Sequence, residues 1–345
     1  MKTRYRCFGF ALILTGILGS CSGLQLSTPE DAKTTQRYDF VIAFGSCDDE
    51  DRENYLWDEV LSVQPDLWIW GGDNIYGDTE DMEVMERKYQ KQLSDSLYQQ
   101  LIASTQVMGT WDDHDYGVND GGEEYPMKKE SQQLLLDFLG VAKDSEQRTR
   151  EGAYASRTFQ TTHGGVKVIV LDTRYFRSPL QKSKDTSRRY DAATGTILGE
   201  SQWTWLEDEL TNSAADFNVI VSSIQVLSSE HGYEKWANFP DEQDRLFELL
   251  KSTRAKNIII LSGDRHISEF SGKVIEKRPL LVDFTSSGLT HAYRDFKGEP
   301  NSYRLGKVIH TESFGVLRFD FQKNLVEFQM IGDNSKVLQS RHQQY

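Results

Sequence analysis

Short apolar runs alternate with helical segments along this 345-residue chain, and this alternation constrains the fold most strongly. Runs of β-branched and aromatic residues, each ended by glycine or a polar side chain, predict buried strands. These runs occupy residues 39–47, 66–73, 106–113, 217–225 and 257–266. Strands that alternate with helices along a chain indicate the α/β class.

Segments with helical periodicity separate the apolar runs. They cover residues 53–63, 80–103, 127–140, 200–212 and 241–252. A hairpin with a Gly-Gly turn is predicted over residues 154–174, and strands dominate after residue 280. The absence of an internal repeat or a low-complexity linker favours one α/β domain over residues 39–345, with some antiparallel strands near the hairpin and the C-terminus.

Polar residues stand where successive predicted strands end. Cys47, Asp73, Asp113, Gln225 and Asp264 stand at the ends of five of them, and Asp172 stands at the end of the second hairpin strand. A single polar residue at a strand end reflects only a solvated loop. Because ligands of α/β sheets bind at the carboxyl ends of strands, the repetition predicts a common site at one edge.

The stretch GGDNIYGD offers a set of metal ligands. Asp73 and Tyr76 lie three residues apart, and Cys47 adds a thiolate. A carboxylate can bridge two cations, and a phenolate is a hard ligand that needs a strong Lewis acid. Aspartate, tyrosine and cysteine together favour Fe(III) over zinc or magnesium.

The consecutive ionisable residues Asp112, Asp113, His114 and Asp115 would repel one another without a counter-charge. Bound cations would hold this cluster together. The stretch SGDRH supplies Asp264 and His266, which can face the same site if Arg265 points away. This oxygen-rich second position suits Ca²⁺, Mg²⁺ or Mn²⁺.

The motifs in this order resemble a known family. GDNIY resembles the GDxxY block of metallophosphatases, DDHD a variant of their GN-H-[DE] block, and GDRH their closing GHxH block. The set FGSC, GGDNIY, WDDHDYGVND, LDTR and SGDRH is similar to the alkaline phosphatase D (PhoD-like) family of the calcineurin-like phosphoesterase superfamily. The resemblance runs from about residue 39 to 290 and implies a four-layer α/β/β/α sandwich. It also implies hydrolysis of phosphomonoesters or phosphodiesters, with iron and calcium as metals.

The resemblance implies roles for individual residues. Cys47, Asp73 and Tyr76 match the iron-binding positions, and Asp113 matches a ligand of the second metal. The closing block corresponds to Asp264 and His266.

The catalytic residues are predicted beside these ligands. His114 matches the imidazole that contacts substrate or protonates the leaving group, and Asp115 is expected to fix its tautomer. Arg174 either holds a phosphate oxygen with its planar fork or forms a structural ion pair, and both interpretations stay open. His291 is a further candidate for the pocket.

The sequence departs from the family pattern in several places. Many family members carry an immunoglobulin-like domain before the first strand, whereas about twenty residues separate Cys21 from that strand here. Gly-Ser-Cys replaces the usual Asp-x-[His/Gly] opening. The histidine of the fourth block is missing near Gln225. These differences leave the identity of the second metal and the preferred substrate open.

The N-terminal residues predict export. Residues 1–20 combine a basic start with a short apolar run, as in a signal peptide. Residues 18–21 resemble a bacterial lipobox, which implies lipidation of Cys21, and residues 21–38 then form a polar tether. We therefore expect a protein anchored by its lipid to a bacterial membrane, on the periplasmic face or the cell surface. An ordinary signal peptide with a chance cysteine is the alternative.

Charge and cysteine content narrow the possible partners. The formal net charge is −14, and losing the three basic residues of the signal takes it to −17. An acidic surface repels nucleic acid, but metal ions can still attract a small phosphoester substrate. Cys47 would be the one thiol of the mature protein apart from Cys21, so no internal disulfide is expected.

Two further points remain open at this stage. A non-catalytic surface lipoprotein that binds Ca²⁺ or a glycan would also fit acidic loops and an anchor, although it explains the motif series poorly. Monoester and diester substrates are not distinguished, because pocket loops choose the leaving group. The polar segments 177–200 and 228–240 are predicted to form such loops, and the oligomeric state is not predicted.

Overall fold

The computed structural model describes Met1 and residues 38–345, and Tyr38–Tyr345 form one compact unit. The predicted signal segment, the predicted anchor Cys21 and the tether up to residue 37 lie outside the described residues. Within the described part of the chain, no helix has the length and apolar character needed to cross a membrane.

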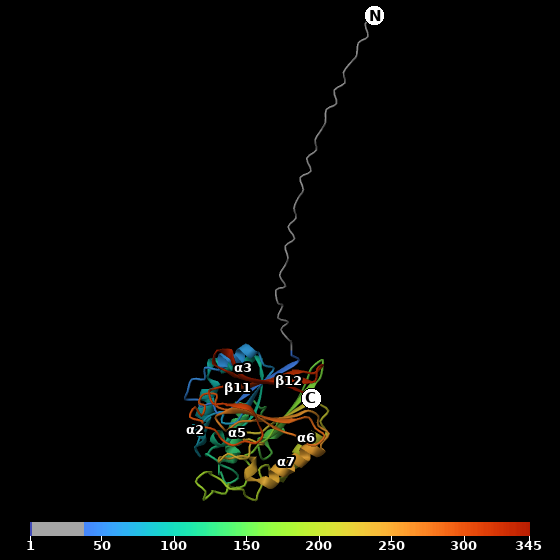
Figure 1. Cartoon of the computed structure of the whole chain (residues 1–345). Helices are drawn as coiled ribbons and strands as arrows, with labels where there is room; N and C mark the ends of the chain where they lie inside the picture. Colours follow the sequence, from blue (N-terminus) through green and yellow to red (C-terminus); the bar gives the residue numbers. More distant parts are fainter. Residues whose placement is uncertain (2–37) are drawn as a thin grey trace. The chain divides into compact units, whose positions relative to one another are not determined.

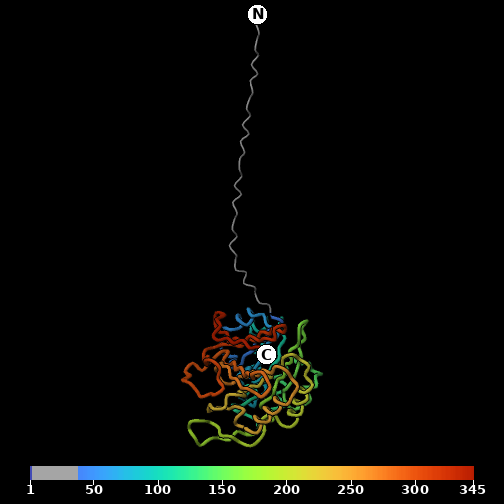
Figure 2. The backbone as a smooth tube through the Cα atoms, turned by 45° about the vertical axis from the view of Figure 1, so that its right-hand side comes forward, coloured from blue at the N-terminus to red at the C-terminus, as the bar shows by residue number. Residues whose placement is uncertain are grey.

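The first sheet has six strands in the order β13-β12-β11-β1-β2-β3. β1, β2 and β3 are parallel, whereas β11, β12 and β13 continue the sheet in antiparallel pairs. Because β11 pairs with β1, the red C-terminal strands lie beside the blue start of the domain in Figure 2. The bounds are β1 Phe40–Gly45, β2 Leu67–Gly71, β3 Gln106–Thr110, β11 Phe314–Asp320, β12 Leu325–Gly332 and β13 Lys336–Gln344.

The second sheet has seven strands in the order β10-β8-β9-β7-β6-β5-β4. β5, β6, β7 and β9 are parallel, and β4, β8 and β10 pair in antiparallel fashion. The predicted Gly-Gly hairpin is confirmed as β4–β5. The bounds are β4 Ala155–Gln160, β5 Gly165–Val170, β6 Phe217–Val221, β7 Ile258–Ser262, β8 Ser268–Lys273, β9 Leu281–Thr285 and β10 Arg304–Ile309.

The helices cover the outer faces of the two sheets. In Figure 1, α2, α3 and α5 lie on one side of the domain and α6 and α7 on the other. The helix bounds are α1 Trp57–Val63, α2 Met82–Leu93, α3 Ser96–Ser104, α4 Asp113–Tyr116, α5 Lys128–Phe138, α6 Gly199–Thr211 and α7 Pro240–Ser252, with short 3-10 turns at Glu146–Arg148, Trp236–Asn238 and Asp333–Ser335.

Three apolar cores define the layers. One core joins the facing sides of the two sheets, for example through Phe44 and Phe284. A second lies between the first sheet and α1, α2, α3 and α5, where Trp57 packs edge-on against Trp70. A third lies between the second sheet and α6 and α7, and Trp203 is part of it. The predicted α/β/β/α sandwich is therefore confirmed.

The helical segment predicted over residues 80–103 is wrong as a single element. It is divided into α2 and α3, because the side chain of Asp95 accepts hydrogen bonds from the backbone N–H groups of Leu97 and Tyr98 and starts a new helix. The segment predicted over 53–63 is helical only from Trp57.

The carboxyl ends of the parallel strands in both sheets meet at one edge, and glycines permit the close approach. A Cβ atom on Gly263, after β7, would lie 2.7 Å from the backbone oxygen of Gly71, which ends β2. Gly72 has φ +101°, and a Cβ there would lie 2.5 Å from that of Asp112. The loops that carry the candidate ligands are thus packed against one another.

Candidate metal centre

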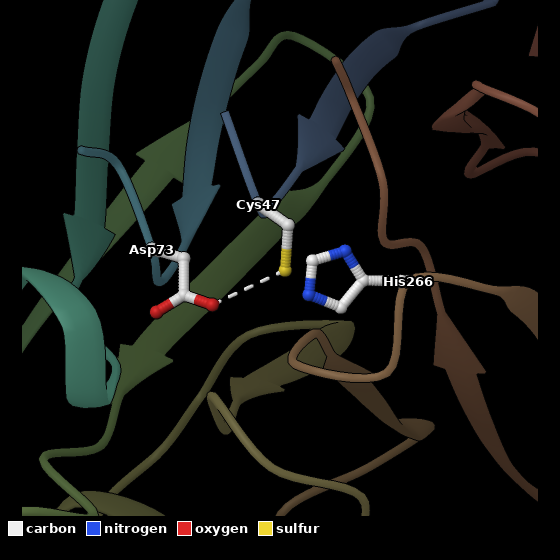
Figure 3. Close-up of side chains that lie close together, drawn as sticks. All are labelled: Cys47, Asp73 and His266. Carbon is white, nitrogen blue, oxygen red and sulfur yellow. Dashed lines mark hydrogen bonds between the residues drawn. The ribbon is translucent and has the colours of Figure 1, made fainter. Parts of the chain in front are cut away.

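Cys47, Asp73 and His266 converge where β1, β2 and β7 end (Figure 3). The Cys47 thiol lies 3.2 Å from Oδ2 of Asp73 and 3.1 Å from Oγ of Ser287. One ligand atom from each of Cys47, Asp73 and His266 lies within 4.8 Å of the others. Sulfur, oxygen and nitrogen ligands are thus presented to one position from loops far apart in sequence.

Tyr76 faces the same position. Its hydroxyl lies 3.5 Å from Nε2 of His266, and its ring packs 4.4 Å from that of His114. Burial, together with the neighbouring Cys47 and Asp73, raises the pKa of Tyr76 well above its usual range. The structure therefore brings Tyr76 to the cysteine and aspartate, as the motif spacing predicts.

Two further ligand groups form a series with the first, in which each group shares one carboxylate with the next. Asp73, Asp113 and His114 form the second, and Asp112, Asp113 and Asp264 form the third, each within 4.8 Å. Asp73 belongs to the first two groups and Asp113 to the last two. Carboxylates shared in this way are suited to bridge neighbouring cations.

The electrostatics of the cluster fit bound cations. Burial and nearby negative charge raise the pKa values of Asp73 and Asp264, and burial raises that of Cys47 to about 12. Burial also opposes ionisation of Asp113, but Arg174 and other partners outweigh it and lower its pKa to about 2. Oδ2 of Asp112 is buried without a hydrogen-bond partner among the described residues. Such an orphan acceptor beside Asp113 and Asp264 fits a cation.

The backbone is strained at the ligand candidates. Cys47, Asp73, Asp264 and His266 have φ values of 58°, 49°, 67° and 52°, in the left-handed region that non-glycine residues avoid. Each such residue costs on the order of 1 kcal/mol. Strain of this kind clusters at functional sites, where the surrounding fold holds it.

The partner of His114 differs from the predicted one. Nδ1 of His114 lies 2.8 Å from a carboxylate oxygen of Asp78, so Asp78 fixes the ring and leaves Nε2 for a ligand or substrate. Burial alone would lower the pKa of His114, but Asp78, Asp73 and Asp113 raise it to about 11.

The prediction that Asp115 orients His114 is therefore wrong. The buried carboxylate of Asp115 accepts hydrogen bonds from the backbone N–H groups of Asp73, Asn74 and Asp112. Adjacent residues of a helix do not face each other. Asp115 binds these N–H groups rather than the His114 ring and ties the loop after β2 to the start of α4.

Arg174 forms buried ion pairs with Asp112 and Glu234. The interpretation of Arg174 as a phosphate-binding residue is therefore wrong, and that of a structural ion pair is confirmed. The Arg174 side chain is fully buried, with Nε 2.6 Å from Asp112 and Nη1 2.6 Å from Glu234. Arg189 and Arg265, by contrast, line the pocket. Removing one partner of such a buried pair leaves an uncompensated charge and costs about 3–5 kcal/mol.

Two strand-end residues also have structural partners. Asp172 accepts from the indole N–H of Trp111, at 2.9 Å, and from backbone N–H groups. The amide of Gln225 donates to Glu269 and Thr285. Both side chains are therefore occupied in stabilising strand ends.

A cavity of about 410 Å³ is lined by the candidate ligands Asp73, Asp113, Asp264 and His266, and by His114. Residues of the two predicted loops also line it, among them Arg189 from segment 177–200 and Tyr233 from segment 228–240, and so does His291. Arg265 lies between Asp264 and His266 in the chain. It is buried and paired with Glu299, yet it also lines the cavity, so the condition that Arg265 points away is not met.

Sequence reasoning missed Asp78, Arg189 and Tyr233 as members of the site. Asp78 ends the stretch GGDNIYGD, so its closeness to the motif was a usable signal. The two polar loops that contain Arg189 and Tyr233 were predicted to shape the pocket, but they carry no motif, and only the fold identifies which of their residues line the cavity.

Comparison with known proteins agrees with this geometry. Residues 42–295 match the PhoD-like phosphatase family. Alkaline phosphatase D of Bacillus subtilis (strain 168) is 24% identical over 240 residues, which are 62% of this chain and 41% of that relative. The chain therefore matches about two fifths of the length of that relative.

Solved structures share the fold at low identity. A structure of PhoD has a TM-score of 0.69 and 17% identity, over 89% of this chain and 69% of that one. A dimetal phosphatase from Danio rerio has a TM-score of 0.57 and 14% identity, over 90% of this chain and 100% of that one. GAP50, the anchor in the inner membrane complex of Plasmodium, has a TM-score of 0.59 and 13% identity, over 88% of each chain. With most of the domain inside the matched residues and the motif loops gathered at one edge, this chain belongs to the PhoD-like phosphatase family.

Proposed function

We propose that this chain is an exported, metal-dependent phosphoric ester hydrolase. The observation that carries the proposal is the set of overlapping ligand groups that share Asp73 and Asp113 inside one cavity. Membership of the PhoD-like phosphatase family supports the same reaction class. Both phosphomonoesters and phosphodiesters remain candidate substrates.

Fe(III) is the cation we propose beside Cys47, Asp73, Tyr76 and His266. Metal ligands of these kinds bind in their deprotonated forms. Burial holds the protons of Cys47 and Tyr76 tightly, so only a strongly Lewis-acidic cation displaces both. Thiolate, phenolate, carboxylate and imidazole together suit trivalent iron better than magnesium or calcium.

A second, divalent cation would bind to the oxygen-rich groups around Asp113. Asp112 and Asp264 contribute further carboxylate oxygens, one of them the orphan Oδ2 of Asp112. Ca²⁺ is the proposed metal, with Mg²⁺ or Mn²⁺ as alternatives, because all three prefer oxygen ligands.

The residues of the chain have separate tasks in hydrolysis. Cations held by these residues would supply Lewis acidity, which would neutralise charge on the phosphoryl oxygens and lower the pKa of water. His114, held at Nδ1 by Asp78, donates a proton from Nε2 to the leaving oxygen as the bond from phosphorus to that oxygen breaks. A new bond forms between phosphorus and the oxygen of a water molecule that has given one proton to solvent. The neutral ring of His114 takes up a proton from solvent before the next substrate binds.

Export and a lipid anchor at Cys21 are part of the proposal. The basic start, the short apolar run and the resemblance of residues 18–21 to a lipobox support it. Cys47 is buried, which would protect its thiol from oxidation in an exported protein.

Metal analysis and a visible spectrum of the purified protein test the metal assignment. The protein should contain iron and show an absorption band from charge transfer between tyrosinate or thiolate and Fe(III). Tyr76→Phe and Cys47→Ser should each shift or weaken this band. A colourless wild-type protein that is fully active with zinc or magnesium alone would defeat the iron assignment.

A further inference from the structure

Two arginines and a tyrosine line the cavity together with the acidic ligand candidates. The guanidinium carbon of Arg265 lies 4.2 Å from the centre of the Tyr233 ring, and that of Arg189 lies 4.9 Å from it. All three residues line the cavity. Cation–aromatic contacts of this kind fix the orientation of the tyrosine ring.

The two arginines differ in their ion pairs: Arg265 is closely paired with a carboxylate, whereas Arg189 is not. Nη2 of Arg265 lies 2.8 Å and 2.7 Å from the two carboxylate oxygens of Glu299, and the Arg265 side chain is 5% exposed. The charge of Arg265 is therefore neutralised inside the fold. Arg265 serves to hold Tyr233 in place.

Arg189 has its guanidinium available. Its side chain is 56% exposed, and the carboxylate nearest to it within the described chain is that of Asp120, at 3.6 Å. Asp120 already accepts hydrogen bonds from the hydroxyl of Tyr190, at 2.5 Å, and from the amide of Asn119, at 2.7 Å. The fork of Arg189 can thus receive two oxygens of a ligand.

The backbone of Arg189 is fixed even though its side chain is exposed. Its N–H donates to the carbonyl of Gly232 at 2.7 Å, and its carbonyl accepts from the N–H of Ser183 at 2.9 Å. The first bond joins the loop that contains Arg189 to the loop that contains Tyr233. The backbone of Arg189 is therefore fixed at the edge of the cavity, and the contact with the Tyr233 ring directs its side chain.

The cavity has room for more than a phosphoryl group. Its volume of about 410 Å³ falls in the range of pockets that hold whole small molecules. The acidic groups and their cations take the phosphoryl group in the proposed function. Arg189 then offers a positive charge, and Tyr233 an aromatic face, to the remainder of the substrate.

We infer that Arg189 and Tyr233 form a subsite for a leaving group that carries its own anionic group, such as a carboxylate or a second phosphate. The inference rests on the proposed function, because the leaving group is defined by the hydrolysis of a phosphoester at the metal centre. The subsite makes an ester with an anionic leaving group a better substrate than an ester whose leaving group is uncharged.

Matched esters test this subsite. Phenyl phosphate is compared with 3-carboxyphenyl, 4-carboxyphenyl and 4-(carboxymethyl)phenyl phosphate in the wild type, Arg189→Gln and Arg188→Gln. Arg188 is a control of similar exposure, paired with Asp191 outside this cavity. Arg189→Gln should lower kcat/KM for the best carboxylated ester about 10-fold, the size expected of a charged hydrogen bond, and that for phenyl phosphate less than 2-fold.

Two outcomes of this comparison overturn the subsite. Equal losses for phenyl phosphate and the carboxylated esters would mean that Arg189 binds the phosphoryl group. No loss with any ester would mean that Arg189 contacts no substrate. The preference for carboxylated esters in the wild type should also shrink at high salt, because Arg189 is exposed and screened.

A binding measurement separates the failure of the subsite from failure of the proposed function. Calorimetric titration with phenylphosphonate and the matching carboxyphenylphosphonates needs no turnover, and thermal unfolding checks that both variants are folded. Selective weakening of the carboxylated ligand in Arg189→Gln supports the subsite even if none of the esters is hydrolysed. If Arg189→Gln binds both kinds of phosphonate as the wild type does, the subsite is refuted, whatever the rates of hydrolysis.

Discussion

Asp113 and His114 are neighbours at the start of α4, yet their atoms have different surroundings. Asp113 belongs to two ligand groups, and its carboxylate also accepts from the backbone N–H of Asp120. His114 is held at Nδ1 by Asp78, and Nε2 remains for chemistry. Substituting Asp113 therefore tests the proposed metal binding, and substituting His114 tests the proposed proton donation.

Asp113→Ala should lower occupancy of the second metal and abolish activity with every substrate. His114→Ala should leave the metal content nearly intact and cost about 10²–10⁴-fold with alcohols of high pKa, which need a proton to leave. The loss should be smallest with a nitrophenyl ester, whose phenolate leaves unaided. Metal analysis and rates on both ester types measure this. If His114→Ala loses metal and slows both types equally, His114 is a ligand or support, and His291 becomes the next candidate acid.

The carboxylate of Asp78 holds the ring of His114. Among the described residues, it makes no hydrogen bond to the candidate metal ligands. Asp78→Asn should retain the metals but lower the rate for alkyl phosphates about 10-fold, because the ring loses its charged partner. Nitrophenyl ester hydrolysis should change little. Asp208→Asn, on the exposed face of α6, is the matched control and should behave as the wild type. Equal losses with both ester types would contradict a positioning role.

At the level of elements, the parallel strands bring their carboxyl ends to one edge of the domain. The loops after these strands supply the side chains of the candidate site. Strands β1, β2 and β7 were predicted from their apolar runs because burial on both faces leaves a strong pattern. The boundary between α2 and α3 was not predicted, because it depends on one residue, Asp95, whose side chain caps the start of α3. The partners of Asp115 and Arg174 were also missed, since they come from loops distant in sequence.

Cys47, Asp73, Asp113 and Asp264 were accessible from sequence because each lies within three residues of a strand end, whereas Tyr76 and His266 were found from their motifs. Cys47 and Asp73 needed no side-chain geometry, only the rule that strand ends meet at one edge. Asp172 and Gln225 obey the same rule but hold strand ends together instead. The position of a polar residue at a strand end therefore locates the edge of the sheet where ligands bind. The hydrogen bonds of its side chain then decide whether it is a candidate ligand or a structural residue.

Asp283 on β9 links the stability of the second sheet to pH. Its buried carboxyl accepts from the backbone N–H groups of Val226 and Leu227, and burial raises its pKa from 3.8 to about 6. Because the folded state holds this proton more tightly, its contribution is fully present below pH 4 and is lost as pH rises through 6.

Unfolding of the wild type and Asp283→Asn in urea should be compared between pH 4 and pH 7. The wild type should lose about 3 kcal/mol relative to the variant over this range, from a shift of roughly two pKa units. Most of the change should fall between pH 4 and 6. A difference that stays constant with pH would contradict a raised pKa of Asp283 in the folded protein.

For the molecule as a whole, the proposed anchor decides where the domain acts. In cells, the wild type should partition with membranes through Cys21. Cys21→Ala should release the protein or block its maturation, which fractionation and mass analysis of the N-terminus would detect. Unchanged membrane attachment of the variant would argue against a lipoprotein.

The central claim is that the overlapping carboxylate groups hold metals that hydrolyse phosphoesters. The most direct measurement is the rate of hydrolysis of a monoester and a diester by wild type and Asp73→Asn, with the metal content of each sample determined alongside. The wild type should hydrolyse at least one ester, lose activity with a chelator and regain it with iron and a divalent cation. Asp73→Asn should lose both metal and activity, because Asp73 belongs to two ligand groups. A folded wild-type protein that binds Ca²⁺ but hydrolyses neither ester would contradict the account and favour a non-catalytic binding protein.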